Sequence, residues 1–343
     1  MKKGKITLAA LALAAGVASS AGAALLITGA GATFPYPIYS KWFSEYNKLK
    51  PELQFNYQSI GSGGGIQQIT NKTVDFGASD APMSDAELDK APAALQHIPT
   101  VLGSVVVTYN GPMTSLKLSP EALAGIFLGK VAKWNDPAIA ADNAGVALPD
   151  APIAVVRRSD GSGTTAVFTD YLAKVSDEWK AKVGAGKSVS WPVGLGAKGN
   201  EGVTGLVKQT PGAIGYVELA YANQNKLPKV AIKNASGKFI EPSIEATSAA
   251  AAGVDMPADY RVSITNSAAA DAYPIASFTY LLVYKNQENA EKGTALVNFL
   301  WWAIHDGQKM AAALDYAPLP AAVVSKVEAT LKTLNVNGKP VAL

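Results

Sequence analysis

Three short stretches of the sequence combine glycine with hydroxyl side chains, and each stands where a β-like run gives way to a helical pattern. They are Thr28–Pro35, Gly61–Ile66 and Arg158–Thr165. Glycine lets the backbone approach a ligand closely, a hydroxyl donates a hydrogen bond, and the first turn of a helix presents free N–H groups. Three such loops that converge would hold an oxyanion without a metal. In any single loop, however, the same residues could simply cap the following helix.

Arginine is rare in this chain, and its positions are a second, independent indication. The sequence contains only Arg157, Arg158 and Arg261, so two of its three arginines adjoin the third loop. A planar guanidinium donates paired hydrogen bonds that fit two oxygens of a tetrahedral anion. Because successive strand side chains face opposite sides, we expect one of the adjacent pair to face the ligand. Asp160 is placed to orient Arg158, although a simple ion pair at a strand end would have the same spacing.

An acidic residue, Asp80, closes a further loop between a strand and a helix that is expected to begin near Ser84. A carboxylate beside an anion is favourable only if the anion carries a proton, which the carboxylate accepts. Two acceptors that face each other in a dry cleft would cost on the order of several kcal/mol, enough to discriminate strongly against a fully ionised anion such as sulfate. The alternative is that Asp80 only caps the next helix.

Composition excludes several classes of site. The chain has no cysteine, so disulfides, thiolate metal sites and thiol catalysis are excluded. His97 and His305 are the only histidines and lie far apart, which argues against an imidazole metal site. The balance of 30 Lys+Arg against 27 Asp+Glu is untypical of a nucleic-acid-binding protein. We therefore expect no metal, no cofactor and no nucleic-acid partner.

Two glycine motifs resemble nucleotide-binding patterns but lack the required context. Gly194–Gly199 fits G-x-G-x-x-G, yet Trp191-Pro192-Val193 before it is a poor first strand for a dinucleotide fold. Gly184–Ser188 ends like a P-loop, the phosphate-binding loop of nucleoside triphosphatases, but its leading glycine is replaced by Ala181. Neither motif supports nucleotide binding.

The elements that must position the loops alternate along the chain. The β-like runs are Leu25–Thr28, Gln54–Ser59, Val74–Gly77, Val105–Tyr109, Ile153–Val156, Ala213–Val217 and Phe278–Tyr284. The amphipathic runs are Ile38–Leu49, Glu121–Leu128, Thr165–Ala173 and Ala295–Ile304, and the alanine-rich stretch Ala246–Ala252 is a helix or a surface loop. This alternation predicts an α/β protein with largely parallel sheets.

Two long β-like segments, Ile98–Tyr109 and Tyr273–Tyr284, bracket a middle region with its own alternating elements. We interpret them as hinge crossovers between two lobes, with residues 24–100 plus 277–343 in lobe I and residues 101–276 in lobe II. A single large sheet without a hinge is the alternative. Residues 1–23 combine a basic start, a short apolar run and an Ala21-Gly22-Ala23 ending, which predicts a cleavable signal peptide and export.

The same loops resemble a known family. GAGATFP, DFGASDAPMSD and AVVRRSDGSGT, with Gly61–Gly65 and Pro211–Glu218, are similar to the periplasmic phosphate-binding protein of the ABC-type phosphate importer, the PstS type. The likeness covers essentially all of the chain after the signal segment. It implies a two-lobed periplasmic-binding-protein fold of type II, in which each lobe is a mainly parallel sheet flanked by helices and two strands form the hinge.

The resemblance also implies ligand contacts, residue by residue. The matching positions are Thr33, Phe34, Ser62, Asp80, Arg158, Ser162, Gly163 and Thr164. In the family, the aspartate that matches Asp80 accepts the phosphate proton, and the one that matches Asp160 pairs with the binding arginine. Both implied roles agree with the roles expected from charge and spacing.

The sequence thus favours a monomeric substrate-binding component that captures inorganic phosphate and passes it, chemically unchanged, to a membrane permease. An enzyme with Ser162 as nucleophile is the first alternative, but it would need a neighbouring base and usually a metal cluster. An extracellular scaffold that merely keeps the fold is the second alternative, and it predicts no measurable affinity for anions.

Overall fold

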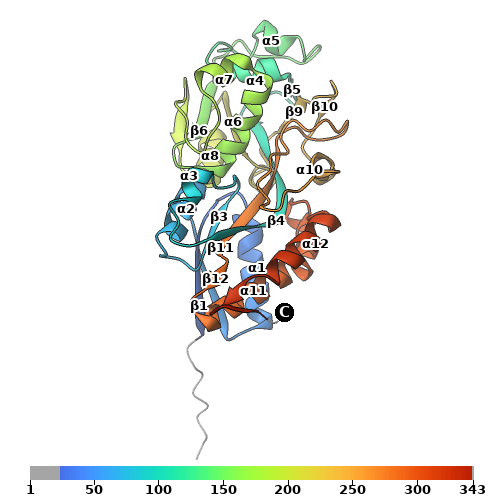
Figure 1. The fold of residues 1–343 in the computed structure, drawn as a ribbon. Helices are drawn as coiled ribbons and strands as arrows, with labels where there is room; N and C mark the ends of the chain where they lie inside the picture. The colour runs from blue at the N-terminus through green and yellow to red at the C-terminus, as the bar shows by residue number, and fades with distance from the viewer. Residues whose placement is uncertain (1–23, 342–343) are drawn as a thin grey trace, which may run out of the picture.

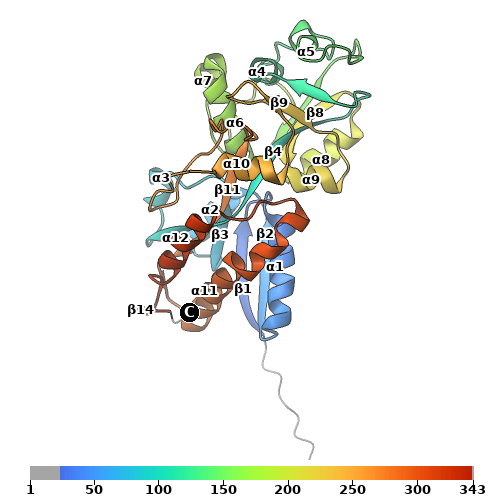
Figure 2. The same ribbon diagram turned by 90° about the vertical axis from the view of Figure 1, so that its right-hand side faces the viewer.

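The structure is a computed structural model that describes residues 24–341, so the predicted signal peptide at residues 1–23 lies outside the described residues. Helices and strands alternate along the chain and gather into two groups, which lie one above the other in Figures 1 and 2. The long strand β4 (Leu95–Tyr109) runs from the lower group into the upper one. The α/β class predicted from the sequence is confirmed.

The lower group contains the first strands and the C-terminal helices. Its main strands are β1 (Leu25–Gly31), β2 (Leu53–Ser59), β3 (Phe76–Ser79) and β11 (Ala276–Tyr284). Its helices are α1 (Tyr36–Leu49), α2 (Ser62–Thr70), α3 (Asp85–Leu88), α11 (Ala290–Ile304) and α12 (Ala321–Leu331), with 3-10 turns η1 (Asp306–Met310) and η2 (Ala312–Leu314). The short strands β12 (Asn286–Gln287), β13 (Asn335–Val336) and β14 (Lys339–Pro340) form a small separate sheet.

Helix α1 is anchored by aromatic side chains. Proline in its first turn favours the helix start, because the fixed proline backbone suits that position and no N–H bond is lost. Residues three and four apart face the sheet and are buried. The ring of Phe43 stacks on Phe55 of β2 at 4.9 Å and contacts Phe299 of α11 at 5.4 Å. This packing fixes α1 against β2 and α11.

The upper group contains the middle of the chain. Its strands are β5 (Leu116–Leu118), β6 (Ala154–Arg158), β7 (Leu195–Ala197), β8 (Ala213–Glu218), β9 (Val230–Lys233) and β10 (Phe239–Ile240). Its helices are α4 (Pro120–Phe127), α5 (Pro137–Ala140), α6 (Gly163–Val175), α7 (Asp177–Lys182), α8 (Gly199–Gln209), α9 (Leu219–Gln224) and α10 (Ile244–Ala251). The alanine-rich stretch therefore forms a helix for most of its length.

Strand β4 links the two groups through its hydrogen bonds. Its first part, Leu95–Ser104, pairs with β11, and its second part, Val105–Tyr109, pairs with β8. The eight strands consequently form one order, β2-β1-β3-β11-β4-β8-β6-β7, in which β4 alone joins the two halves. All fifteen residues of β4 are buried. Long apolar strands of this kind are typical of strands that are covered on both faces.

The sheets are mixed, which corrects the prediction of largely parallel sheets. Strand β1 is parallel to β2 and β3, and β6 is parallel to β7 and β8. Strand β11, however, is antiparallel to both of its neighbours, and β4 is antiparallel to β8. The physical reason is that the chain returns to the lower group along β11, next to β4 and in the opposite direction.

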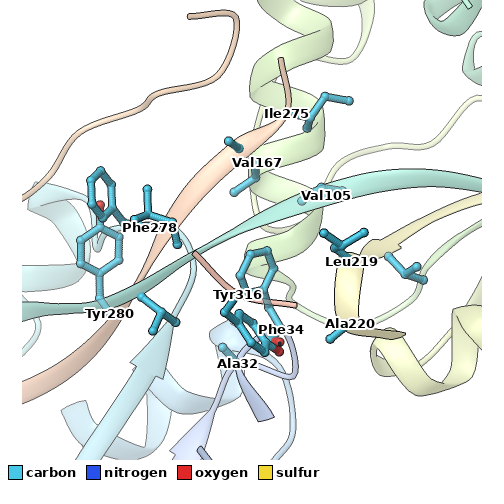
Figure 3. Packing of buried hydrophobic residues seen from close by; sticks show 14 of the residues in the cluster. Ala32, Phe34, Val105, Val167, Leu219, Ala220, Ile275, Phe278, Tyr280 and Tyr316 are labelled. Atoms are coloured by element: carbon cyan, nitrogen blue, oxygen red, sulfur yellow. Dashed lines mark hydrogen bonds between the residues drawn. The ribbon is translucent and has the colours of Figure 1, made fainter. Parts of the chain in front are cut away.

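The apolar core is continuous where β4 and β11 cross beside α6, as Figure 3 shows. Val105 of β4, Phe278 of β11 and Val167 of α6 lie around this crossing. Just below it, the rings of Phe34 and Tyr316 pack with centroids 6.4 Å apart, and the Tyr316 hydroxyl donates to the Phe34 carbonyl at 2.6 Å. The backbone after β1 is therefore fixed directly under the crossing strands.

Candidate anion-binding site

The predicted site residues lie at the ends of strands and the beginnings of helices in both groups. In the lower group, Thr33 and Phe34 lie between β1 and α1, Ser62 is the first residue of α2, and Asp80 directly follows β3. Strands β2, β1 and β3 are neighbours and parallel, so these loops leave the sheet at the same edge. Ligands of open α/β sheets bind outside this carboxyl edge.

In the upper group, the predicted residues belong to one strand-to-helix loop. Arg158 is the last residue of β6, Ser162 is the N-cap of α6, and Gly163 and Thr164 begin that helix. The two groups meet at these loops, because the N–H of Gly63 in α2 donates to the carbonyl of Gly161 at 2.9 Å. Gly163 is buried, and each of the other seven predicted contacts is at most 3% exposed.

Asp80 is held by hydroxyl groups. Thr279 of β11 donates to Asp80 Oδ1 at 2.9 Å, and the Ser62 hydroxyl lies 3.4 Å from Asp80 Oδ2. The Ser277 hydroxyl donates to the Asp80 carbonyl at 3.2 Å. Burial raises the pKa of Asp80 to about 7, although the Thr279 hydrogen bond, the charge of Arg158 and the Ser62 hydroxyl counteract this rise. At slightly alkaline pH, Asp80 is thus a buried carboxylate that accepts hydrogen bonds.

Gly163 lies where the two groups come closest. A Cβ atom at this position would lie 2.4 Å from Ser62 Oγ, 2.5 Å from Asp80 Oδ2 and 2.7 Å from Asp80 Cβ. Real Cβ atoms do not approach other atoms so closely. Only glycine allows the start of α6 to reach the Ser62 and Asp80 side chains, which also shows how near these three residues are to one another.

Arg158 is fixed by Asp160. The guanidinium donates through Nε to Asp160 Oδ1 at 2.8 Å and through Nη2 to Oδ2 at 2.6 Å, and its side chain is 1% exposed. Burial alone would raise the pKa of Asp160, but the hydrogen bonds and charge of Arg158, together with the Gly199 N–H, hold it below its ordinary value. The guanidinium edge that bears Nη1 is left to face Thr164, at 3.4 Å. Arg157 is only half-buried and donates to the Arg158 carbonyl at 3.2 Å.

A side chain amide links the threonines of the two groups. Asn200, in the first turn of α8, donates through Nδ2 to Thr33 Oγ1 at 2.7 Å and to Thr164 Oγ1 at 3.0 Å. Thr164 in turn contacts Arg158. The predicted residues therefore form one connected set. Asn200 links Thr33 to Thr164, and Gly163, which precedes Thr164 in the chain, lies close to the side chains of Ser62 and Asp80.

The helix starts supply further donors. In α6 the Thr165 N–H donates to Ser162 Oγ at 3.0 Å, and the Ala166 N–H donates to the Ser162 carbonyl. The N–H groups of Gly163 and Thr164 precede the first internal bond of the helix and are available to an anion. Because Ser162 Oγ already accepts a bond from Thr165, its own proton is free to be donated outward.

The two histidines of the chain have partners outside the predicted set of contact residues. Within residues 24–341, no three His, Cys, Asp or Glu side chains are grouped so that they could hold a metal ion. His97 accepts a bond from the Met83 N–H at 2.9 Å, and burial lowers its pKa to about 4. His305 pairs with Glu328 and the Trp301 carbonyl. In the part of the chain that the structure describes, the hydrogen bonds of both imidazole rings go to groups other than Ser162.

The structure brings together all eight predicted contact residues and Asp160, while their contact with a ligand remains a prediction. It also adds residues that sequence reasoning missed. Asn200 follows Gly199, the last glycine of the motif that does not support nucleotide binding. Gly199 begins α8 directly after the short connection from β7, so Asn200 too lies where a strand gives way to a helix. Thr279 and Ser277 are hydroxyls in an otherwise apolar strand, which was the only signal for them.

Comparison with known proteins agrees with this geometry. The profile of the PBP superfamily domain matches residues 16–306. The phosphate-binding protein PstS of Pasteurella multocida is 51% identical over 312 residues, which covers 90% of this chain and 90% of the relative. The phosphate-binding protein PstS of Haemophilus influenzae is 48% identical over 312 residues, covering 90% and 92%.

Solved structures show the same fold. A phosphate-binding protein from Stenotrophomonas maltophilia superposes with a TM-score of 0.69 at 22% identity, over 89% of this chain and 93% of that protein. The architecture is therefore the α/β periplasmic-binding-protein fold. Because the profile covers most of the sequence and relatives near half identity span 90% of it, this chain belongs to the PBP superfamily and, within it, to the PstS family, whose members are binding proteins and not enzymes.

Proposed function

We propose that this chain is the substrate-binding component of an ABC phosphate importer and that it binds inorganic phosphate at the loops described above. One observation carries the proposal. A single buried site combines the Arg158 guanidinium, several hydroxyl groups and the starts of α2 and α6 with the carboxylate of Asp80. Relatives of 51% and 48% identity that are named phosphate-binding proteins support the choice of anion.

The ligand contacts follow from the donors and the acceptor. Arg158 and the hydroxyls of Thr33, Ser62, Ser162 and Thr164 donate to the phosphate oxygens, as do the N–H groups of Phe34, Gly163 and Thr164. Asp80 is the acceptor, and it receives the proton of the P–OH group.

The same acceptor gives the selectivity. Sulfate has no proton at neutral pH, so it would leave its own oxygen facing the Asp80 carboxylate. Two desolvated acceptors in contact disfavour binding by on the order of several kcal/mol. The site therefore selects phosphate over sulfate by rejecting the wrong anion as much as by binding the right one.

We further propose that the two groups of elements are lobes that close on the ligand, with residues 24–100 plus 277–343 in lobe I and 101–276 in lobe II. Strands β4 and β11 would form the hinge of a type II binding protein. Contacts across the lobes support this proposal: Lys187 Nζ lies 2.8 Å from Glu87 Oε2, and Arg261 Nη1 lies 2.6 Å from Asp85 Oδ1. Each pair joins a residue of lobe II to a residue of lobe I, as closure requires.

The remaining parts of the proposal concern the surroundings of the protein. Residues 1–23 would direct export and be removed. The remaining chain would act in the periplasm as a monomer and pass phosphate to the permease subunits. Among residues 24–341, no helix has both the length and the apolar character of a membrane span. A scaffold that keeps only the fold would have no need for an arginine buried to 3% exposure and paired with an aspartate whose side chain is 12% exposed.

The proposal is tested by exchanging one of two adjacent arginines. Arg158→Ala removes a buried charged donor, and truncation of such a group costs about 2–5 kcal/mol, so phosphate affinity should fall roughly 30- to 4,000-fold. Arg157→Ala is the matched control, since its side chain is outside the connected set, and it should bind like wild type. Isothermal titration with phosphate measures both. Wild-type affinity in Arg158→Ala would refute the proposed site.

A further inference from the structure

A buried asparagine spans the two proposed lobes at the centre of the site. Asn200 is 0% exposed, and it donates to hydroxyls on both sides, Thr33 in lobe I and Thr164 in lobe II. Its backbone N–H also donates to Thr33 Oγ1, at 3.1 Å. Asn200 is not one of the ligand contacts expected from the sequence. Its side chain instead donates to the hydroxyls of two residues that are.

The orientation of this amide is fixed from behind. The N–H of Glu218 donates to Asn200 Oδ1 at 2.9 Å. Glu218 itself is held, because it ends β8, caps α9 and accepts from the Ala220 N–H at 2.8 Å. An N–H donor can only be satisfied by the amide oxygen, so the amide nitrogen must face the two threonines.

The fixed amide determines where the threonine protons go. A hydroxyl group has two acceptor lone pairs and one proton. Thr33 Oγ1 accepts from both the backbone and the side chain nitrogen of Asn200, while Thr164 Oγ1 accepts from Asn200 Nδ2 and lies 3.4 Å from Arg158 Nη1. With the lone pairs occupied, each hydroxyl is left with its proton to donate.

We propose that Asn200 is a positioning residue that turns Thr33 and Thr164 into obligate donors toward the anion. This inference rests on the proposed phosphate site and deepens it. Because one nitrogen serves both threonines, the two hydroxyls are aligned together only when Thr33 of lobe I lies against Thr164 of lobe II. Asn200 therefore couples the alignment of the donors to the closure of the lobes.

Truncation tests the role directly. Asn200→Ala leaves both hydroxyls free to turn their lone pairs toward the anion, and by analogy with groups that orient metal ligands we expect phosphate affinity to fall about 10- to 100-fold. Asn143→Ala is the matched control: this buried asparagine also bonds through both amide atoms, but to Lys117 and Ile139, away from the site. It should lower the melting temperature without changing phosphate affinity.

A double-mutant cycle separates positioning from packing. If Asn200 acts through the hydroxyl it orients, Asn200→Ala should cost at least about threefold less affinity in a Thr33→Val background than in the wild-type chain, because the oriented proton is already gone. A purely structural role predicts equal losses in both backgrounds, which would overturn the inference.

A second variant keeps the test valid if Asn200→Ala does not fold. Asn200→Asp preserves the size of the side chain and the acceptor for the Glu218 N–H, but it replaces the donor by a second acceptor. It should weaken phosphate binding, and an affinity within about threefold of wild type would refute the positioning role. Absence of phosphate binding by the wild-type chain would instead contradict the proposed function itself.

Discussion

Replacing Gly163 by alanine would place one methyl group between the proposed lobes. Its carbon would lie 2.4 Å from Ser62 Oγ and 2.5 Å from Asp80 Oδ2, whereas ordinary contacts of a Cβ atom begin near 3.4 Å. The start of α6 must therefore move away from the Ser62 and Asp80 side chains by about 1 Å. In the proposed open arrangement of the lobes these groups would be apart, so the methyl group would clash with neither side chain.

The size of the effect follows from the cost of overpacking. An extra methyl group in a closely packed place costs about 1–3 kcal/mol, and if only the closed form bears this cost, phosphate affinity falls about 5- to 150-fold. Folding should be unimpaired, since Gly163 is not among the glycines of positive φ and alanine is the better helix former. The ligand-free variant should thus be as stable as wild type and yet bind poorly.

Gly205→Ala is the matched control. Gly205 also lies in a helix, α8, but a Cβ atom there would have nothing within 4 Å. Isothermal titration with phosphate gives the affinities, and urea unfolding of the ligand-free proteins gives their stabilities. Phosphate affinity of Gly163→Ala within about twofold of Gly205→Ala would refute the reasoning that the two lobes meet at Gly163 in the bound state.

Three further predictions concern Asp80 and its hydroxyl partner. Asp80→Asn should reduce the ratio of phosphate to sulfate affinity at least about tenfold, because the amide can present a donor where the carboxylate presents an acceptor; an unchanged ratio in competition titrations would rule out the proton-acceptor role. The unfolding free energy of the ligand-free protein should be lower at pH 8 than at pH 5, because burial raises the pKa of Asp80 from 3.8 to about 7. The stabilisation that comes from the protonated Asp80 side chain is complete below pH 3.8 and is lost as the pH rises through about 7. Burial raises the pKa of Glu218 too, so Glu218 contributes to the same pH dependence of stability. The contribution of Asp80 is the part that Asp80→Asn removes, and an unaltered slope of unfolding free energy against pH in that variant would contradict the raised pKa of Asp80. Thr279→Val removes the 2.9 Å bond to Asp80 Oδ1, which should raise the pKa of Asp80 further and weaken phosphate binding more at pH 7 than at pH 9; equal weakening at both values would count against this link.

The sequence predicted the strands and helices that carry the site because their signals are local. Strand β1 and helix α1, for example, follow from a β-rich run that ends in small residues and a proline-led amphipathic stretch. The strand directions could not be predicted in the same way. Whether β11 runs with or against β3 depends on a return crossing almost 200 residues later in the chain, which leaves no local pattern.

In the candidate site, too, residues in local motifs could be predicted, whereas residues that act through distant contacts could not. Thr33, Ser62 and Arg158 stand in glycine-rich loops with a recognisable design, so residue type and spacing indicated the loops, and the family resemblance then implied Thr33 and Ser62 as contacts within them. Asn200 and Thr279 act through hydrogen bonds to residues far away in the sequence: Asn200 lies 167 positions from Thr33, and Thr279 lies 199 positions from Asp80. A lone asparagine or threonine carries no motif, and only the folded chain shows that each one faces a site residue.

The central claim is that one buried carboxylate and one buried guanidinium select a protonated tetrahedral anion. The most direct measurement is isothermal titration of the purified wild-type protein at pH 8, where Asp80 is mainly ionised, with phosphate and with sulfate in parallel. We predict one phosphate bound per chain and no measurable heat from sulfate. Sulfate binding of comparable affinity, or the absence of phosphate binding, would contradict the account.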